Sequence, residues 1–559
     1  MKNRYIFLTS LLAFQLTVAF AQWSTDPANP GIVCDVAGLQ SNPQAIADDN
    51  GGVYVFWIDN RLNDNYAHEV YGQHYDANGY ALWEEDGRRI LSHSTKINWF
   101  SASRIFNGEI IIGWLTAIEA GTDSLRIQRL NEDGTKIWEN ELIVANAGIT
   151  PNYILGMYGY NIIHDNSGYC ISIGTVYFGG SSGNRITRFS SDGVLTGMYN
   201  GEPEGTQYNY GSSGLQSAFD AAANIYIYYS TANGAGAELM CLKVNTAGDT
   251  IWGPVAVLTG TLGLSYQFSG ISDADGITFV WQGNGDEGSG SNLYARRLNS
   301  DGVLAWSGLT LPVCAVDGFQ VNFFWKRSGD NYYITWGDGR PGTSPGNYDI
   351  YAQKFDKNGT VFWNANGVLT NSTNTYSPFP EFDLNEDNSM VICHQTTTIG
   401  YIVQKVLDNG TVVWDENGHQ VCTPIFSPFY SEHVVVYSGN KVISVWAKSI
   451  ASGGSNDIYI TRVDNTGVTG VAELNSDQTR IFPNPASDEV IVVLAENRND
   501  AVVKLIDLSG KEVIRKIVST KAPVNRLRIS ISDIESGTYL ICIEREKEIV
   551  THKLIVKQD

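Results

Sequence analysis

Two short stretches of the chain place a carboxylate and a guanidinium two residues apart, soon after a tryptophan. They are Asp59 with Arg61, and Asp338 with Arg340. Because a carboxylate and a guanidinium form strong paired hydrogen bonds, we expect each pair to hold its loop in place. The same groups are also candidates for ligand binding, since loops at one end of a repeat fold commonly carry function. If a pair is exposed to solvent, its loss should cost under about 1 kcal/mol of stability.

The rest of the sequence offers no known catalytic pattern. The eight histidines are dispersed, and the sequence contains no HExxH, no Gly-x-Ser-x-Gly and no glycine-rich phosphate loop. We therefore predict no catalytic, cofactor-binding or metal-binding residues and no cofactor, which favours a non-enzyme. A net charge of −22 argues against nucleic acid as a partner, because binding phosphate requires an excess of Lys and Arg.

Residues 1–21 have the pattern of a signal peptide, with a basic start, an apolar run and a small-x-small site ending at Ala21. We expect the chain to be exported. Export permits disulfides, yet the seven cysteines are scattered and odd in number. Cys34, Cys314 and Cys422 recur at one phase of the repeat described next. We therefore expect them to be buried apolar residues rather than bridged pairs.

One sequence motif recurs along the chain: an acidic residue or Asn, then a Gly, then a Trp four residues after that Gly. Counting two degenerate copies that lack the Trp, the eight glycines lie 51 to 59 residues apart. Such a period indicates repeated units that pack on one another. A Trp that recurs at one phase favours packing between units over chemistry. These tryptophans are Trp83, Trp138, Trp252, Trp306, Trp363 and Trp414.

Each period has the pattern of four short antiparallel strands. Residues 53–57 and 277–281 are typical of the second strand, residues 70–75 and 293–298 of the third, and the Trp is expected to open the fourth. With almost no helical periodicity, the sequence predicts an all-β fold, an eight-bladed β-propeller. Seven blades remain the alternative if the weak repeat around Gly193 belongs to a neighbouring blade.

The eighth repeat stops near Asp464 and lacks a fourth strand. Residues 23–34 resemble the fourth-strand segments 306–314 and 414–422 of other repeats. We infer that the mature N-terminus completes the last blade, which joins the two ends of the propeller and covers two sheet edges.

The turn phrase resembles the tryptophan-docking repeat of pyrroloquinoline-quinone-type propellers, which recurs around an eight-bladed ring. The resemblance implies the architecture. It does not extend to the redox chemistry of those enzymes, because the chain has no vicinal Cys-Cys pair and no evident cofactor-pocket signature.

Composition changes near residue 470. Residues 478–559 carry 13 Lys+Arg and 12 Asp+Glu, a net charge of +1, whereas residues 22–477 carry 22 and 47, a net charge of −25. We expect a propeller over residues 22–470, a linker over 471–478 and a small C-terminal β-sandwich over 479–559. Its expected strands are residues 489–494, 502–508, 512–517, 526–531, 538–545 and 549–556.

This tail resembles the type A C-terminal sorting domain of the type IX secretion system of Bacteroidetes-type bacteria. The resemblance implies passage through the periplasm, export by the type IX secretion machinery, and removal of the tail with lipopolysaccharide attachment or release. The protein is then secreted or lies on the outer-membrane surface. The residues that carry the motif are Pro483, Asn484, Pro485, Gly510, Gly537, Tyr539 and Lys553.

For function, the sequence favours a non-enzymatic binding module for polysaccharide or a surface protein. Loops rich in Tyr, Asn, Gly and Ser, residues 153–160 and 207–214, have a composition suited to such ligands. The alternatives are a glycan-active hydrolase or lyase, or a quinoprotein-like oxidoreductase. Two close carboxylates in the central channel would favour the hydrolase.

Overall fold

The computed structural model is all-β and falls into two compact units, residues 1–469 and 470–559, which we describe separately. The expected signal peptide and linker lie outside the described residues. The structure describes residues 23–61, 69–93, 96–104, 108–116, 123–149, 160–165, 168–178, 181–201, 215–233, 236–258, 264–284, 290–308, 310–340, 347–375, 379–396, 400–415, 418–422, 433–449, 456–464, 480–482, 486, 489–493, 501–507, 511–518, 526–545 and 548–557.

In the first unit the described strands form groups of four in which successive strands pair antiparallel. The first groups are β2 (Gln40–Ala47), β3 (Val53–Asp59), β4 (Glu69–Tyr75) and β5 (Arg88–Ser92); β6 (Ile97–Arg104), β7 (Ile110–Thr116), β8 (Asp123–Leu130) and β9 (Leu142–Ile149); β10 (Tyr160–Asp165), β11 (Gly168–Phe178), β12 (Ser181–Phe189) and β13 (Leu195–Gly201); β14 (Leu215–Phe219), β15 (Ile225–Asn233), β16 (Gly236–Val244) and β17 (Thr250–Leu258).

The later groups follow the same order, except that the last one takes its fourth strand from the N-terminus. They are β18 (Leu264–Asp273), β19 (Gly276–Asn284), β20 (Gly290–Asn299) and β21 (Leu311–Cys314), with the 3-10 turn η3 (Trp306–Gly308); β22 (Gly318–Ser328), β23 (Asn331–Asp338), β24 (Tyr348–Asp356) and β25 (Val368–Thr375); β26 (Glu381–Leu384), β27 (Met390–Thr396), β28 (Gly400–Val406) and β29 (His419–Gln420); β30 (His433–Ser438), β31 (Lys441–Ser449), β32 (Asn456–Asp464) and β1 (Gly31–Cys34). A short parallel pairing of β20 with β22 joins two of the groups into one larger sheet.

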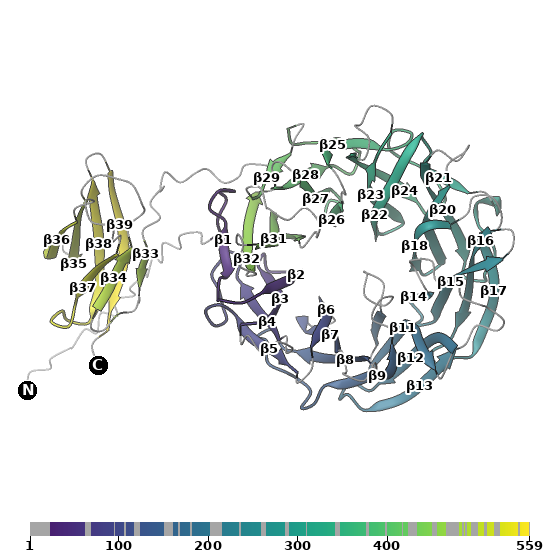
Figure 1. Ribbon diagram of the computed structural model, residues 1–559, viewed down its shortest axis with the longest axis horizontal. Helices are drawn as coiled ribbons and strands as arrows, with labels where there is room; N and C mark the ends of the chain where they lie inside the picture. Colours follow the sequence, from purple (N-terminus) through teal and green to yellow (C-terminus); the bar gives the residue numbers. More distant parts are fainter. Residues whose placement is uncertain are drawn as a thin grey trace, which may run out of the picture. The chain divides into compact units, whose positions relative to one another are not determined.

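The sheets follow one another around a common centre, and the labelled first strands β2, β6, β14, β18, β22 and β26 lie innermost (Figure 1). First strands of successive sheets contact each other in most cases, and β30 of the last sheet contacts β2 of the first. The second strands β3 and β7 are buried along their length, since every residue of these two strands is buried. A strand enclosed on both faces has the near-continuous apolar sequence that these segments show.

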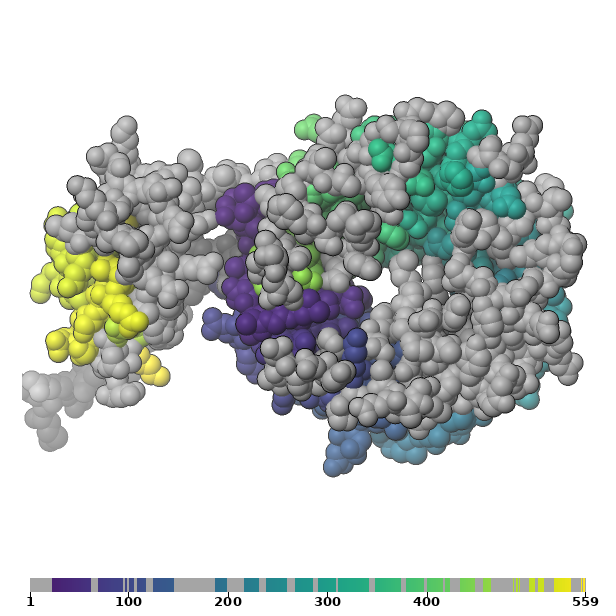
Figure 2. All heavy atoms as spheres, viewed as in Figure 1, coloured from purple at the N-terminus to yellow at the C-terminus, as the bar shows by residue number. Residues whose placement is uncertain are grey.

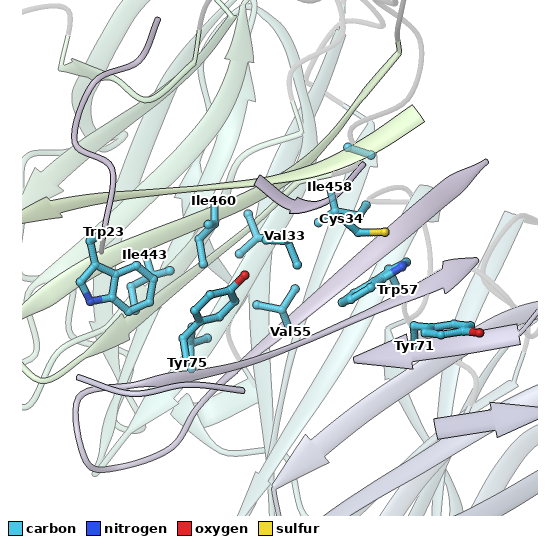
Figure 3. Close-up of a cluster of buried hydrophobic side chains, with 13 residues drawn as sticks. Trp23, Val33, Cys34, Val55, Trp57, Tyr71, Tyr75, Ile443, Ile458 and Ile460 are labelled. Carbon is cyan, nitrogen blue, oxygen red and sulfur yellow. The ribbon is translucent and has the colours of Figure 1, made fainter. Parts of the chain in front are cut away.

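The N-terminal strand is the outer strand of the last sheet. β1 pairs antiparallel with β32, with Gly31 opposite Ile460. Purple N-terminal residues and green residues of the last sheet lie together on one face of the molecule (Figure 2). The close-up shows Trp23 and Cys34 packed with Tyr75 and Trp57 of the first sheet (Figure 3). The chain's first described residues therefore contribute to the core between the last and first sheets.

The repeated turn has a simple physical basis. In the copy that begins at Asp76, the carboxylate accepts hydrogen bonds from the backbone of Asn78 (2.8 Å) and Tyr80 (2.9 Å). Gly79 has φ 87°, which a residue with a side chain adopts only with strain. A Cβ on Gly79 would also collide with Trp23. The glycine thus serves both the turn and the close approach of an indole ring.

The periodic tryptophans pack on the turn of the next repeat. Trp83 lies against Gly134, and Trp252 lies against Gly302. The Trp252 indole also donates a hydrogen bond to the carbonyl of Ser300 (2.8 Å). Trp138, Trp363 and Trp414 are buried, whereas Trp83, Trp252 and Trp306 are partly buried.

The expectation that each Trp opens the fourth strand was wrong for most copies. Trp252 lies inside β17, but Trp306 lies in η3, and Trp83 precedes β5 by five residues. The reason is that the Trp side chain extends away from its own sheet and packs on the turn glycine of the next repeat. The backbone consequently makes only an isolated bridge before the fourth strand begins, as between Tyr75 and Ala81.

The second unit is a small sandwich of two antiparallel sheets around one apolar core. The six strands expected from the alternating pattern are present within one residue at each end, and one further strand, β33, was not expected. The strands are β33 (Arg480–Phe482), β34 (Glu489–Val493) and β37 (Arg526–Ser530) in one sheet, and β36 (Glu512–Val518), β35 (Ala501–Asp507), β38 (Gly537–Arg545) and β39 (Glu548–Val556) in the other.

Candidate functional site

The first acid and base pair lies at the end of β3, in the first sheet. Arg61 donates from Nη2 to Asp59 Oδ2 (2.7 Å) and from its backbone to Asp59 Oδ1 (2.8 Å). The same Nη2 reaches the carbonyl of Asp86 (2.8 Å), in the turn before β5. Trp57 Nε1 donates to Asp59 Oδ2 (2.8 Å). The pair therefore ties the loop after β3 to the turn before β5.

The second pair has the same geometry at the end of β23. Arg340 donates to both carboxylate oxygens of Asp338, at 2.9 and 2.7 Å, and to the carbonyl of Asn366 (2.9 Å). Trp336 Nε1 donates to Asp338 Oδ2 (2.8 Å). Asp338 is fully buried, and the Arg340 side chain is 22% exposed. The case of an exposed, low-cost ion pair does not apply, because the sheets enclose the carboxylate.

A cysteine from the preceding sheet completes each cluster. Cys34 Sγ lies 3.3 Å from Arg61 Nη2, and Cys314 Sγ lies 3.7 Å from Arg340 Nη2. Both thiols are buried and form no disulfide with a described residue, as expected, and Cys422 is also buried. Burial raises the pKa of Cys34 to about 12, so its thiol stays protonated. Each cluster therefore joins two neighbouring sheets.

An aromatic ring covers each guanidinium. The Arg61 guanidinium carbon lies 3.7 Å from the ring centre of Tyr71, and that of Arg340 lies 3.6 Å from the ring centre of Tyr351. Burial by itself would lower the pKa of Arg61, but the hydrogen bond and charge of Asp59 outweigh burial and raise it. With these contacts, the geometry supports a structural role for both pairs.

The two aspartates also accept a hydrogen bond from a buried indole N–H that would otherwise have no partner. Three sheets carry a Trp at the position of Trp57 but have no Asp two residues later. In these, the indole nitrogens of Trp114, Trp281 and Trp446 are buried and have no hydrogen-bond partner among the described residues. A buried N–H without a partner is destabilising. An Asp two residues after the Trp therefore stabilises the fold, because it accepts the hydrogen bond of the indole.

A longer duplicated motif surrounds the two clusters, and the sequence analysis missed it. Four residues after Cys34 and Cys314 the chain has the pattern Gly-x-Gln-x-Asn, beginning at Gly38 and Gly318. Gln40 and Gln320 are fully buried, and neither amide has a partner among the described residues. Comparing the two 25-residue segments directly would have revealed the pattern.

A second missed signal is a basic residue five positions before every one of the eight repeat glycines. In several sheets the base meets an acid from the first hairpin of its own sheet, as Lys243 meets Asp220 (2.8 Å) and Arg297 meets Asp273 (2.7 Å). Lys354 differs, because it pairs with Asp408 of the following sheet (2.6 Å). The eight positions are His74, Arg129, Arg188, Lys243, Arg297, Lys354, Lys405 and Arg462.

A third polar cluster lies on the innermost strands. Asp383 of β26 accepts hydrogen bonds from Lys326 Nζ of β22 (2.8 Å) and from the backbone of Tyr437 of β30 (2.9 Å). Three successive sheets thus meet at one carboxylate. Phe382, between Asp383 and Glu381 in sequence, packs against Phe324 of β22 with ring centres 5.4 Å apart.

Glu381 is half-buried and has no hydrogen bond or ion pair with any described residue. Burial raises its pKa to about 7, and the positive charge of Lys326 opposes that rise. Its register partner is Cys393 of β27. The charged and titratable groups that act on it or lie beside it are Lys326, Cys393 and, two residues along the strand, Asp383.

His433 reaches the same strand position from β30. Its Nε2 lies 3.4 Å from the carbonyl of Cys393, its ring packs on Tyr401 at 4.6 Å, and its Nδ1 has no partner among the described residues. Burial lowers the pKa of His433 to about 4, so the ring is neutral near pH 7. No sequence pattern indicates this cluster, because its members come from four strands.

In the part of the chain that the structure describes, no group of three or more His, Cys, Asp or Glu residues is arranged to hold a metal ion. No helix among the described residues is long and apolar enough to cross a membrane. Neither finding decides the function.

The sorting-motif residues are only partly described. Pro483, Asn484, Pro485 and Gly510 lie outside the described residues. Gly537 and Tyr539 lie in β38, and Lys553 lies in β39 opposite Leu540. The backbone of Lys557 donates to the carbonyl of Ala486 (2.9 Å), so the two ends of the tail meet in the fold.

Residues 480–557 match the secretion system C-terminal sorting domain. This match marks the protein as one exported by type IX secretion to the cell surface or the outside. The resemblance of the propeller repeat to the pyrroloquinoline-quinone type stays a prediction.

No curated protein matches the chain. Among solved structures, it is similar to a puromycin hydrolase (9% identity, TM-score 0.35, covering 78% of this chain and 62% of that one). It is also similar to the acylaminoacyl peptidase of Pyrococcus horikoshii (10%, 0.37, 74% and 58%) and to the polysaccharide lyase Uly1 (9%, 0.38, 69% and 94%). At these TM-scores the similarities carry no argument about function.

Proposed function

We propose that residues 22–470 form an eight-bladed β-propeller, closed by the N-terminal strand, that works outside the cell as a non-enzymatic binding module for polysaccharide or protein. The observation that carries the proposal is the sorting domain at residues 480–557, because export brings the first unit to surroundings where such ligands are found. The pairing of β1 with β32 and the contact of β30 with β2 support the closed arrangement.

The acid and base pairs support a scaffold role in this proposal. Asp59 and Asp338 lie at the ends of second strands, beside the loops that connect them to third strands. Their hydrogen-bonding capacity is directed at the protein itself, so they hold loops in place instead of offering free groups to a ligand. Binding would then fall to the loops and to the inner strands at that end.

One observation favours a second candidate, a glycan-active hydrolase. Glu381 and Asp383 are two residues apart on one face of an innermost strand, where such positions are about 6 to 7 Å apart. Carboxylates at roughly this separation, one of them with a raised pKa, are the groups that glycoside hydrolysis requires. The quinoprotein-like alternative gains no support from a described residue.

The test is to probe the mature chain, residues 22–559, on a glycan microarray and against purified outer-surface proteins, with hydrolysis of each bound glycan measured in parallel. Saturable binding without cleavage is the expected result. Cleavage that Glu381→Gln abolishes would favour the hydrolase. Absence of binding to either class would refute the proposed function.

A further inference from the structure

The outer edge of the third sheet differs from the outer edges of the other sheets. Its outer strand, β13, pairs with β12 on one side, and no described strand pairs with its other side, which faces the rim of the first unit (Figure 1). The strand spans seven residues and contains neither a charged residue nor a proline. Such an edge presents a row of backbone N–H and C=O groups that can pair with another strand.

Most of the other outer strands have features that discourage such pairing. β1, β21 and β29 have four residues or fewer, β5 begins with two arginines, and β17 contains Pro254. β9 and β25 lack these features. Among their residues of described exposure, however, each shows only one exposed large apolar side chain, Ile143 in β9 and Leu369 in β25.

β13 and the turn before it expose several apolar side chains close together. Leu195 and Met198 are 50% and 51% exposed, and Val194, directly before the strand, is 59% exposed. A strand edge that is long, apolar, uncharged and exposed is a site for pairing between chains. All three side chains are open to solvent, so a partner can reach them.

The missing tryptophan of the third repeat accounts for this edge. Gly197 lies four residues after the turn glycine Gly193, where six other repeats carry the packing Trp. Because no indole has to extend toward the next repeat, β13 begins two residues after Gly193, whereas β5 begins nine residues after Gly79. A Cβ at Gly197 would have no atom within 4 Å, so the strand has open space beside it.

We infer that β13 pairs antiparallel with β13 of a second copy of the chain, about a two-fold axis near Met198, and joins the two third sheets into one. The backbone edge selects an extended strand as its partner, because main-chain donors and acceptors pair best with those of another strand. Two copies of one strand are complementary when they run antiparallel, since a two-fold axis reverses the chain direction. The inference does not depend on the proposed ligand.

Charge favours a contact between copies at this edge. Residues 22–477 carry a net charge of −25, so two copies repel each other over most of their surface. β13 has no charged residue, and β12 contains Arg185 and Arg188 but no acidic residue. The turn between them adds a single acid, Asp192. The edge therefore lacks the acidic excess that keeps the copies apart elsewhere.

The symmetric pairing places Met198, the central residue of β13, opposite Met198 of the second copy. Directly opposed residues of an antiparallel pair have Cα atoms about 4.5 to 5.5 Å apart, a separation that a disulfide can bridge. A cysteine introduced at this position should therefore link the two copies under mild oxidation.

The experiment measures sedimentation equilibrium of the mature chain, residues 22–559, over a wide range of concentrations. We expect a reversible equilibrium between monomer and dimer. Met198→Glu should weaken the dimer about tenfold or more, because it places like charges opposite each other at the two-fold axis. Val303→Glu adds the same charge at a similarly exposed apolar residue of the fifth repeat, and this matched control should dimerise like the parent.

The cysteine variants test the position of the contact. On oxidation, Met198→Cys should give a disulfide-linked dimer on a non-reducing gel, whereas Val303→Cys should stay unlinked. A dimer that Met198→Glu leaves intact, or that Met198→Cys does not link, would place the contact elsewhere and refute the pairing of β13.

A parent chain that stays monomeric at every concentration would overturn the inference, whatever the variants do. If the parent is monomeric and Met198→Glu abolishes binding of another surface protein, the edge accepts a foreign strand and the second copy is the wrong partner. Sedimentation of the parent does not depend on whether a variant folds, and thermal melting checks the folding of each variant.

Discussion

Arg340 illustrates how a surface-loop residue becomes part of the core. Its guanidinium bonds a fully buried carboxylate and a turn carbonyl and packs on Tyr351. Arg340→Ala would leave the Asp338 charge buried without its partner, which costs about 3 kcal/mol in comparable cases. Chemical denaturation should show this loss, while Arg327→Ala, exposed on the same sheet, should change stability by under about 0.5 kcal/mol. Equal effects of the two variants would contradict the structural role.

Glu381 should make stability depend on pH. Its pKa is about 7 in the folded chain, above the value near 4.3 expected when unfolded, so the folded state holds the proton more tightly. Stability therefore falls as pH rises from about 4.5 to 7, by about 3 kcal/mol in all, and stays low above pH 7. Glu381→Gln cannot ionise. It should melt higher than the parent at pH 8 and like the parent at pH 4.5; the same melting temperature for both proteins at both pH values would show that the carboxyl is well solvated.

Among the elements, the short strand β1 is expected to contribute strongly to stability. It supplies the fourth strand of the last sheet, and Trp23 just before it is buried against the turn at Gly79. Removing residues 22–35 should uncover β32 and part of the core between the last and first sheets. We expect a melting temperature lower by 10 °C or more, or aggregation. Removing 558–559 from the other terminus is the control, and an unchanged melting temperature of the N-terminal truncation would refute the closure.

The docking of a Trp on the following turn can be tested at Trp363, which is 8% exposed and donates to the carbonyl of Asp408 (3.0 Å). Trp363→Ala should cost about 3 to 5 kcal/mol, because it empties the space against Gly410. Trp363→Phe keeps a ring there and loses the hydrogen bond, so it should cost clearly less. Equilibrium unfolding of both variants measures the difference. A neutral Trp363→Ala would mean that the periodic Trp is not a packing element.

At the scale of the whole molecule, the division into two compact units predicts that the first unit folds without the tail, whereas export requires the tail. Deleting residues 478–559 removes the sorting domain but none of the described residues of the first unit. The truncated protein should accumulate in the periplasm and keep the melting behaviour of the first unit. Cell fractionation and melting of the purified fragment measure both. Efficient surface display without the tail would contradict the assignment of the export signal.

Much of the architecture could be predicted because it depends on short-range patterns. The glycine at position 79 is required by a positive φ, and the alternating residues of the tail mark strands such as β34 and β38 within one residue. A repeated sequence motif also marks the repeated units, since each copy obeys the same local rules. The starts of the fourth strands were predicted less accurately. The indole of each unit packs on the turn of the neighbouring unit, and no local sequence pattern shows this.

By itself, the sequence determined the repeat, the strand pattern, the export tail and the pairing of Asp59 with Arg61, because each of these depends on residues close together in the chain. Only the tertiary structure decided that those pairs are buried, that Cys34 joins them from another sheet, and that Asp383 pairs with Lys326 of the preceding sheet. These features depend on residues 25 to 57 positions apart that packing of neighbouring sheets brings together. Burial, which sets the strength of an ion pair and the pKa of an acid, is a property of that packing and cannot be read from local spacing.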